Sequence, residues 1–394
     1  MTIRILLLLV LFAVLLPYRA GAATVRVAVN GVDGQQCGIG KALPCRTITR
    51  AIGNATVGDT IEVGPGRYGD VDGDGQFTSP GDEPAQVDIG CDCVVHVPLE
   101  KRLVIVSRLG AAATVVHAGG ALVRVVDVDA AGTVFGKAKK GFTLTGSGDS
   151  RGLDSSAPDL TVAGNVAVRN GSHGMRISGD RLVLSGNQAG ANGASGFQLD
   201  GARDVVVTGN VANGNANDGF DQVNRGTFAG NTAIANGGAG FSQQDDDVTY
   251  RASTALGNGG AGFEVNQGDR TVLVGILAQG NATGIETGGD DVVVSKSSVV
   301  GNRGFGILVD EDGQRLTVTK TNVFGNGADA SDPAFANCGI ASAGGGPLTL
   351  SPVFWGDGGG PGADPADRIC LLVPHGNVTA EPALTKELKV KPPR

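Results

Sequence analysis

Acidic side chains recur at one point of a repeated pattern in the second half of the sequence, with basic side chains close by. The residues that could do chemistry there are Asp246, Asp247, Asp290, Asp291, Arg251 and Lys296. Two carboxylates a suitable distance apart can act as acid and base on a glycosidic bond. Alternatively, calcium held by carboxylates can stabilise an enolate-like intermediate while an Arg or Lys removes the proton. These six residues are therefore the predicted catalytic set. The alternative is ordinary turn chemistry, because Asp often precedes a strand.

A second acidic stretch, residues 70–76, has the pattern of a calcium loop. Asp70, Asp72 and Asp74 alternate ahead of a glycine, and Gln76 follows it. Alternate oxygens can converge on one hard cation, the glycine permits a sharp turn, and the next residue offers a carbonyl group. The stretch resembles the start of EF-hand and dockerin loops, but the twelfth position is not acidic and Asp82 is the nearest acid beyond it. The predicted calcium ligands are therefore Asp70, Asp72, Asp74, Gln76 and Asp82, with a solvated acidic turn as the alternative.

The element that must position the first group is a repeat of about 22 residues. Asparagine marks the same point of each unit, at Asn170, Asn192, Asn215, Asn236, Asn258, Asn281, Asn302 and Asn326. Such a period is typical of a solenoid, whose units bury their apolar faces against their neighbours. Apolar residues alternate inside each unit, as at Val205 and Val207, which indicates strands rather than helices. Leucine-rich repeats share the period, but their dense leucine framework is absent from this sequence.

Coils of short strands that stack about 4.8 Å apart place like residues above like residues. The asparagines then form a ladder whose amides hydrogen-bond from coil to coil. A second column precedes the first by five residues: Asn165, Asn187, Asn210 and Asn231, continued by Ser253 and Ser297 and interrupted at Ile276. The sequence therefore predicts an all-β fold, a right-handed parallel β-helix solenoid with a short N-terminal capping helix and an irregular C-terminal cap.

These repeats resemble those of right-handed parallel β-helix proteins, namely the pectate-lyase-like superfamily and the β-helix domain of periplasmic copper-binding-type proteins. The resemblance covers most of the mature chain, and it is specific for fold rather than for chemistry. It implies a polysaccharide lyase or hydrolase for a catalytic member, and Gly289-Asp290-Asp291 resembles a Gly-Asp-Asp of polygalacturonase-like hydrolases. The chain departs from the alginate-epimerase pattern, which has Asp-Pro-His. Met and His are too few for copper ligation.

Composition shifts divide the chain into segments. Ile48, Ile52 and Ala55 have the spacing of a short amphipathic helix, which would cover the open end of the solenoid. The predicted boundaries are 1–22 signal peptide, 23–68 N-terminal cap and first coil, 69–93 acidic insertion loop, 94–326 β-helix coils, 327–385 C-terminal cap, and 386–394 flexible tail.

The first 22 residues have the features of a secretory signal peptide, with an apolar run at 5–16 and a small-residue site at Ala20-Gly21-Ala22. No other segment is long enough to span a bilayer, so the mature chain is expected to be secreted or periplasmic, cut after about Ala22. A net charge of -8 argues against nucleic acid and anionic membranes as partners.

Six cysteines in the exported part favour disulfides. The pairs that proximity suggests are Cys37–Cys45 and Cys338–Cys370. Cys91 and Cys93 lie two residues apart on one strand face, which is a poor geometry for a mutual bond. A CxC metal site is the alternative for this pair.

These features predict an exported β-helix protein that binds or acts on polysaccharide, as a lyase or hydrolase if it is catalytic. The alternative is a non-catalytic cell-surface protein with a structural or adhesive role, whose partner is a polysaccharide or the cell envelope. The corners between residues 165 and 326 are nearly constant in length, which weighs against a deep cleft. Phe228 and Tyr250 are expected to point inward, and the single Trp355 lies in the cap, so aromatic sugar platforms are few.

Overall fold

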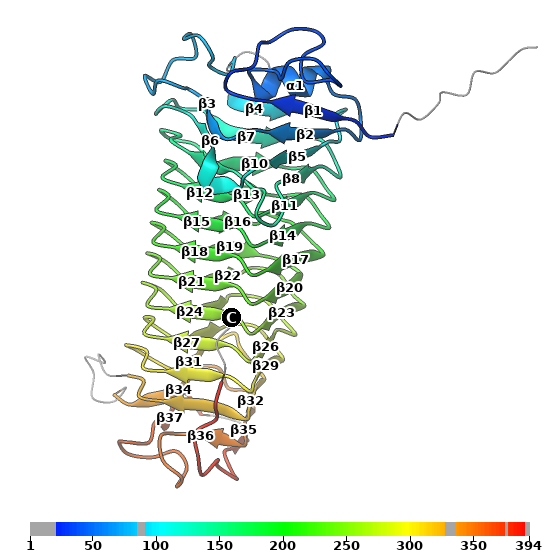
Figure 1. Ribbon diagram of the computed structural model, residues 1–394. Coiled ribbons are helices and arrows are strands. Elements are labelled where there is room, and N and C mark those ends of the chain that lie inside the picture. The colour runs from blue at the N-terminus through cyan, green and yellow to red at the C-terminus, as the bar shows by residue number, and fades with distance from the viewer. Residues whose placement is uncertain (1–20, 85–90, 328–335, 375–376, 391–394) are drawn as a thin grey trace, which may run out of the picture.

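The chain folds into a column of stacked coils whose strands form three parallel sheets (Figure 1). The computed structural model describes residues 21–84, 91–327, 336–374 and 377–390; the signal segment 1–20 lies outside the described residues. Each strand pairs with the equivalent strand of the next coil, which confirms the parallel β-helix solenoid. Among the described residues, no helix has the length and apolar character needed to cross a bilayer.

The A sheet has 14 strands and runs the full length of the column. Its strands are β1 (Thr24–Val27), β2 (Thr60–Val63), β5 (Val104–Ser107), β8 (Val134–Phe135), β11 (Thr161–Ala163), β14 (Val183–Ser185), β17 (Val205–Thr208), β20 (Gly226–Ala229), β23 (Val248–Arg251), β26 (Val272–Val274), β29 (Val292–Ser295), β32 (Leu316–Thr319), β35 (Leu348–Leu350) and β38 (Val378–Thr379).

The B and C sheets have 12 strands each. The B sheet comprises β3 (Gly66–Gly69), β6 (Thr114–His117), β9 (Thr143–Thr145), β12 (Val166–Val168), β15 (Gln188–Gly190), β18 (Val211–Asn213), β21 (Thr232–Ile234), β24 (Thr254–Leu256), β27 (Leu277–Gln279), β30 (Ser298–Val300), β33 (Thr321–Phe324) and β36 (Val353–Phe354). The C sheet comprises β4 (Cys93–Val97), β7 (Arg124–Val128), β10 (Leu153–Ser155), β13 (Met175–Ile177), β16 (Phe197–Gln198), β19 (Phe220–Val223), β22 (Phe241–Gln243), β25 (Phe263–Val265), β28 (Ile285–Thr287), β31 (Ile307–Val309), β34 (Cys338–Ser342) and β37 (Arg368–Leu371).

The asparagine ladder predicted from the repeat is confirmed. Asn192 donates from its backbone nitrogen and its Nδ2 to Oδ1 of Asn215, at 3.2 and 2.9 Å, and Asn215 repeats both bonds to Asn236 at 3.1 and 2.9 Å. The ladder ends on a buried carboxylate, because Oδ2 of Asp367 accepts from Nδ2 of Asn326 at 2.8 Å. Burial raises the pKa of Asp367. The second column is interrupted where predicted, since Ile276 is buried there as an apolar side chain.

The core is filled by like side chains stacked along the column axis. Phe197, Phe220, Phe241 and Phe263 stack with ring centroids 4.7 to 4.8 Å apart. Phe228 and Tyr250 point inward as predicted, each with no exposed surface. A glycine precedes each stacked ring because the coils approach closely there: a Cβ on Gly219 would lie 2.6 Å from the carbonyl oxygen of Gly240.

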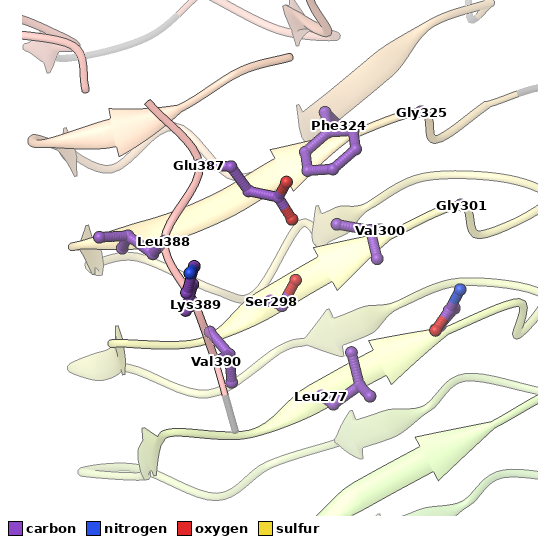
Figure 2. A pocket seen from close by; sticks show the side chains of 11 residues that line it. Leu277, Ser298, Val300, Gly301, Phe324, Gly325, Glu387, Leu388, Lys389 and Val390 are labelled. Carbon is purple, nitrogen blue, oxygen red and sulfur yellow. The ribbon is translucent and has the colours of Figure 1, made fainter. Parts of the chain in front are cut away.

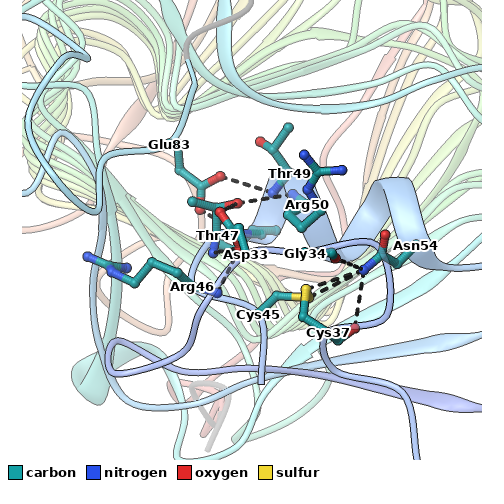
Figure 3. Close-up of a disulfide and its surroundings, with 11 residues drawn as sticks. Asp33, Gly34, Cys37, Cys45, Arg46, Thr47, Thr49, Arg50, Asn54 and Glu83 are labelled. Carbon is teal, nitrogen blue, oxygen red and sulfur yellow. Dashed lines mark hydrogen bonds between the residues drawn. A yellow bond between two sulfur atoms is a disulfide. The ribbon is translucent and has the colours of Figure 1, made fainter. Parts of the chain in front are cut away.

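The N-terminal end is covered by helix α1 (Ile48–Asn54), as the apolar spacing predicted, and by the loop before it (Figure 3). Glu83 reaches in from the acidic loop and accepts from the backbone nitrogens of Ile48 and Thr49 at 2.6 and 2.9 Å. Its burial raises the pKa of Glu83 to about 7. The predicted disulfide Cys37–Cys45 lies beneath the helix, where Asn54 donates to the carbonyl oxygen of Cys37.

The second predicted disulfide, Cys338–Cys370, joins neighbouring strands β34 and β37. The expectation for the remaining pair is wrong, because Cys91 and Cys93 are bonded to each other. The prediction placed both residues on one extended strand. In the structure Cys91 precedes β4, and Asp92 between them has φ of 44°, so the chain turns and brings the two sulfurs together.

Residues 387–390 cross back over the outer surface of the B sheet (Figure 2), and the flexibility expected for residues 386–394 stays a prediction. The backbone of Leu388 exchanges two hydrogen bonds of 2.8 Å with the side chain of Asn322 on β33. A hollow of about 640 Å³ lies between residues 387–390 and strands β27, β30 and β33. Of the predicted tail, residues 391–394 lie outside the described residues.

Candidate functional site

The predicted acidic corner lies at the turn that leads into the A sheet, and there the carboxylates alternate with guanidinium groups. Residues at equivalent positions of successive coils are Asp159, Arg181, Asp204, Arg225, Asp247, Arg270, Asp291 and Arg315. Each arginine pairs with the aspartate of the preceding coil; Nε of Arg270 lies 2.7 Å from Oδ1 of Asp247. The hydrogen bonds from Arg270 and Arg315 hold the pKa of Asp247 and of Asp291 below the usual range. We call this column the Asp–Arg ladder.

The neighbouring column, which includes Asp246 and Asp290, also joins coil to coil. Oδ1 of Asp246 accepts from the backbone nitrogen of Asp269 at 2.9 Å, and Oδ1 of Asp290 accepts from that of Gln314 at 2.9 Å. Arg251 and Lys296 lie at the opposite end of the A-sheet strands, about 13 Å along the chain from Asp247 and about 17 Å from Asp291, respectively. The structure thus brings the four carboxylates to one corner but does not bring the two predicted bases to them.

Neutralising the Asp–Arg ladder at one step should barely affect stability. Asp291 and its partner Arg315 are each about half exposed, and an exposed ion pair contributes little. Asp291→Asn should therefore change the melting temperature by about 2 °C or less. Thermal unfolding of Asp291→Asn, Arg315→Gln and the double variant measures this. A cooperative loss of more than about 5 °C in each single variant would make the ladder a principal source of stability.

A second polar column, which the sequence analysis missed, lies on the outward face of the C sheet. The residues at its central positions are His96, Asp127, Asp154, Arg176, Gln198 and Asp221. The signal was present, because each of these residues stands next to inward apolar residues, as Arg176 does between Met175 and Ile177. It was overlooked because residues 94–164 do not repeat regularly enough to align with the later coils.

Arg124 contacts several polar groups on this face. Its Nη1 donates to the carbonyl oxygen of Cys91 at 3.0 Å and to Oδ2 of Asp127 at 2.9 Å. Its Nε lies 3.0 Å from Oδ2 of Asp154, which Nη1 of Arg151 also contacts at 3.1 Å. Two carboxylates are thus held side by side by two guanidinium groups from neighbouring coils.

The two carboxylates differ in their surroundings. Asp127 is 5% exposed, and Arg124 is its charged hydrogen-bond partner. Burial raises the pKa of Asp127 to about 6; Arg124 lowers it, while the carboxylates of Asp129 and Asp154 raise it. Asp154 contacts two guanidinium groups instead of one. A pair of carboxyl groups in such different environments can supply one proton donor and one anion near neutral pH.

The carboxylate pair faces a hollow of about 330 Å³ that is open to solvent. Its polar lining residues are Arg124, Asp127, Asp129, Asp154, Ser155, Ser156, Arg176 and Ser178. At its N-terminal side Nε2 of His96 lies 2.9 Å from Oδ2 of Asp129. The hollow beneath the C-terminal segment is larger, but among the described residues its charged lining side chains are Glu387 and Lys389 alone, both exposed. We therefore identify the C-sheet hollow as the candidate site on its chemistry rather than on its size.

The acidic loop brings together three of its five predicted calcium ligands. The carboxylate oxygens of Asp70, Asp72 and Asp74 lie within 4.8 Å of one another. Asp70 accepts from the backbone nitrogen of Gly75, and Asp74 accepts from that of Gln76, both at 2.7 Å. Asp82 instead closes the base of the loop, since its oxygens accept from the backbone nitrogens of Val71 and Ser79. This donor set, three carboxylates on a tight turn, fits a hard divalent cation.

Stacked coils, an internal asparagine ladder and one polar sheet face define a parallel β-helix protein. The chain belongs to the family described as the right handed beta helix region, which matches residues 140–233 and 221–352, and the predicted handedness is thereby confirmed. No curated protein matches the chain.

Solved structures with the same fold have little sequence in common with this chain. The A-module of the Azotobacter vinelandii mannuronan C-5 epimerase AlgE6 is 16% identical, with 84% of this chain and 92% of that chain covered and a TM-score of 0.52. The Dettilon tailspike protein is 12% identical, with 88% and 68% covered and a TM-score of 0.54. The catalytic unit of a GH87 α-1,3-glucanase from Streptomyces thermodiastaticus is 15% identical, with 86% and 67% covered and a TM-score of 0.50. At these identities the likeness concerns the fold alone.

Proposed function

We propose that the protein is exported and acts on a polysaccharide that lies along the outward face of the C sheet. The observation that carries this proposal is the buried Asp127 beside Asp154, both facing one open hollow and both contacting Arg124. Asp127 would donate a proton to the linkage, while Asp154, which contacts two guanidinium groups, would act as base or stabilise developing positive charge. Three disulfides agree with an oxidising compartment.

Arg176 is the group in the hollow that could contact an anionic polymer, beside the carboxyl groups of Asp127, Asp129 and Asp154. Arg176 lines the same hollow as Arg124, and its Nη2 contacts Oδ2 of Asp200, whose side chain is 43% exposed, at 2.8 Å. A guanidinium group in such a position can exchange an exposed carboxylate partner for the carboxylate of a uronate unit. Structures with this fold include an epimerase of mannuronan and an α-1,3-glucanase, so both uronate polymers and neutral glucans belong in the test.

The test is product release from a panel of uronate polymers and neutral glucans. Lyase products gain a double bond that absorbs in the ultraviolet, and hydrolase products gain reducing ends. Activity that Asp127→Asn abolishes and Asp290→Asn/Asp291→Asn preserves would support the C-sheet site. The opposite pattern would move the site to the corner predicted from the sequence, with Asp246, Asp247, Arg251 and Lys296 as its other members.

A non-catalytic carbohydrate-binding or adhesive role is the second candidate. It is favoured by the short, nearly constant corners of the regular coils, which leave the C-sheet face without high walls. Binding of a polymer on a gel or sensor without any product from either assay would select this role.

The acidic loop would hold calcium as a structural ion, because it lies at the N-terminal end of the column. Adding calcium to chelator-treated protein should raise the melting temperature by a few degrees, since a ligand that binds only the folded state stabilises it. Asp72→Asn/Asp74→Asn should abolish the rise, whereas Asp246→Asn should preserve it. Equal melting curves with calcium and with chelator would leave the loop as a solvated acidic turn.

A further inference from the structure

A buried carboxylate lies at the point where the mature chain is expected to begin. Oδ1 of Asp59 accepts a hydrogen bond from the backbone nitrogen of Ala23 at 2.8 Å. Its other oxygen accepts from the backbone nitrogen and the hydroxyl of Thr56, both at 2.8 Å. Asp59 is 6% exposed, while residues 21–23 are exposed. One side chain therefore ties the start of β1 to the turn before β2.

The bond partner of Asp59 is the nitrogen that processing would convert from an amide into an amine. Cleavage between Ala22 and Ala23 agrees with the small residues at the end of the signal segment. The released α-amino group carries a positive charge at neutral pH. We propose that Asp59 is a built acceptor for this N-terminal ammonium group, so that signal cleavage after Ala22 completes the N-terminal cap by creating an ion pair.

The local charges suit an ammonium group at this position. Burial raises the pKa of Asp59, but the hydrogen bonds from Thr56 and Ala23 together with the charge of Lys101 outweigh burial and leave the pKa lowered. Lys101 is itself occupied, because its Nζ donates to the carbonyl oxygens of Ile52, Gly53 and Ala55. Arg102 lines a hollow together with Ala23 and Asp59. The carboxylate is thus ionised at neutral pH and keeps one oxygen for the N-terminus.

The pairing would stabilise a strand at the end of its sheet. β1 pairs within the A sheet only with β2, and the backbone nitrogen of Thr60 donates to the carbonyl oxygen of Ala23 at 2.8 Å. With the ammonium group in place, Ala23 is held through both its nitrogen and its carbonyl group. A charge-assisted hydrogen bond is roughly twice as strong as a neutral one, so the processed chain should hold β1 more firmly than a chain that continues upstream.

The pH dependence follows from the sign of the linkage. An ionised carboxylate raises the pKa of an ammonium group in the folded state above its unfolded value of about 8. The extra stability is therefore fully present below about pH 8 and is lost as the pH rises through the raised folded value. The cations near Asp59 are the N-terminal ammonium group, Lys101 and Arg102. Of these three, the ammonium group alone differs between the processed and the extended forms.

The test compares a chain that begins at Ala23 with one that begins at Gly21, each with and without Asp59→Asn. Hydrogen exchange at the amides of β1 should be about tenfold slower in the Ala23 form at pH 7, and the difference should vanish above about pH 10. In the Asp59→Asn pair the two forms should exchange alike, even if both are less stable overall.

The exported protein gives an independent measurement, because its first residue can be read by mass spectrometry. We expect Ala23. Cleavage at another bond, or equal protection of β1 in the Ala23 and Gly21 forms, would overturn the proposal. The inference rests on the export that the proposed function includes. Neither readout depends on any activity toward polysaccharide, so the inference and the proposed activity stand or fall separately.

Discussion

Replacing Asn236 with leucine should lower the free energy of unfolding by about 3–5 kcal/mol, a loss typical of a broken network of buried hydrogen bonds. Asn236 is 2% exposed, and its Oδ1 accepts from both nitrogens of Asn215. Its Nδ2 donates to the carbonyl oxygen of Ala212 and to Oδ1 of Asn258. Leucine has a similar volume but accepts nothing, so the backbone nitrogen of Asn215 would lose its acceptor, and Nδ2 of Asn215 would keep only its bond to the carbonyl oxygen of Ala189. Urea unfolding of the variant measures the loss.

Asn213→Leu is the matched control, because Asn213 lies in the preceding coil, paired with Ile234, and is exposed on the outer surface of β18. Its replacement should change stability by no more than about 0.5 kcal/mol. Because each coil contacts only its neighbours, the Asn236 variant should also broaden the transition by uncoupling the two halves of the column. Similar losses in both variants would show that the ladder contributes nothing beyond ordinary packing.

The fold could be predicted because its determinants are local and repeated. The asparagine spacing and the alternation at Val205 and Val207 each specify a corner or a strand without reference to distant residues. Stacking identical coils then fixes the register. The bond between Cys91 and Cys93 could not be predicted in this way, since it depends on the left-handed conformation of Asp92 at one irregular turn.

The site was harder to predict because its partners come from different coils at a variable sequence distance. Arg270 and Asp247 are 23 residues apart, so the pairing is visible only after the register is known to the residue. If the alignment of the coils is shifted by one position, the same corner presents Asp246, Asp269 and Asp290, three carboxylates that repel one another. Asp127 and Asp154 are 27 residues apart and lie in neighbouring coils outside the regular repeat. Nothing in the sequence marks Arg124 as their shared partner.

The largest expected effect on activity comes from Asp127→Asn, which should reduce turnover of the polysaccharide by about 10²–10⁴-fold. The asparagine keeps the shape of the side chain and can still face Arg124, but it has no acidic proton to transfer to the substrate. Because the pKa of Asp127 is raised to about 6, the wild-type rate should fall as the pH rises above that value. Measurement of the turnover of both proteins between pH 4 and pH 9 tests the assignment.

Stability shows whether the carboxyl group of Asp127 titrates with a raised pKa, and its comparison with turnover separates a proton donor from a merely structural carboxylate. The folded protein binds the proton of Asp127 more tightly than the unfolded chain, whose ordinary value is near 4, so ionisation disfavours the fold. Wild-type stability should therefore decline as the pH rises from about 4 to about 6, and this part of the decline should be absent from Asp127→Asn. Asp291→Asn, which removes a carboxylate of lowered pKa, should keep this decline in stability. If Asp127→Asn lost the decline and kept full turnover, Asp127 would be a buried acid without a catalytic role, and the hollow beside Arg124 would have to work through Asp154 and the guanidinium groups alone.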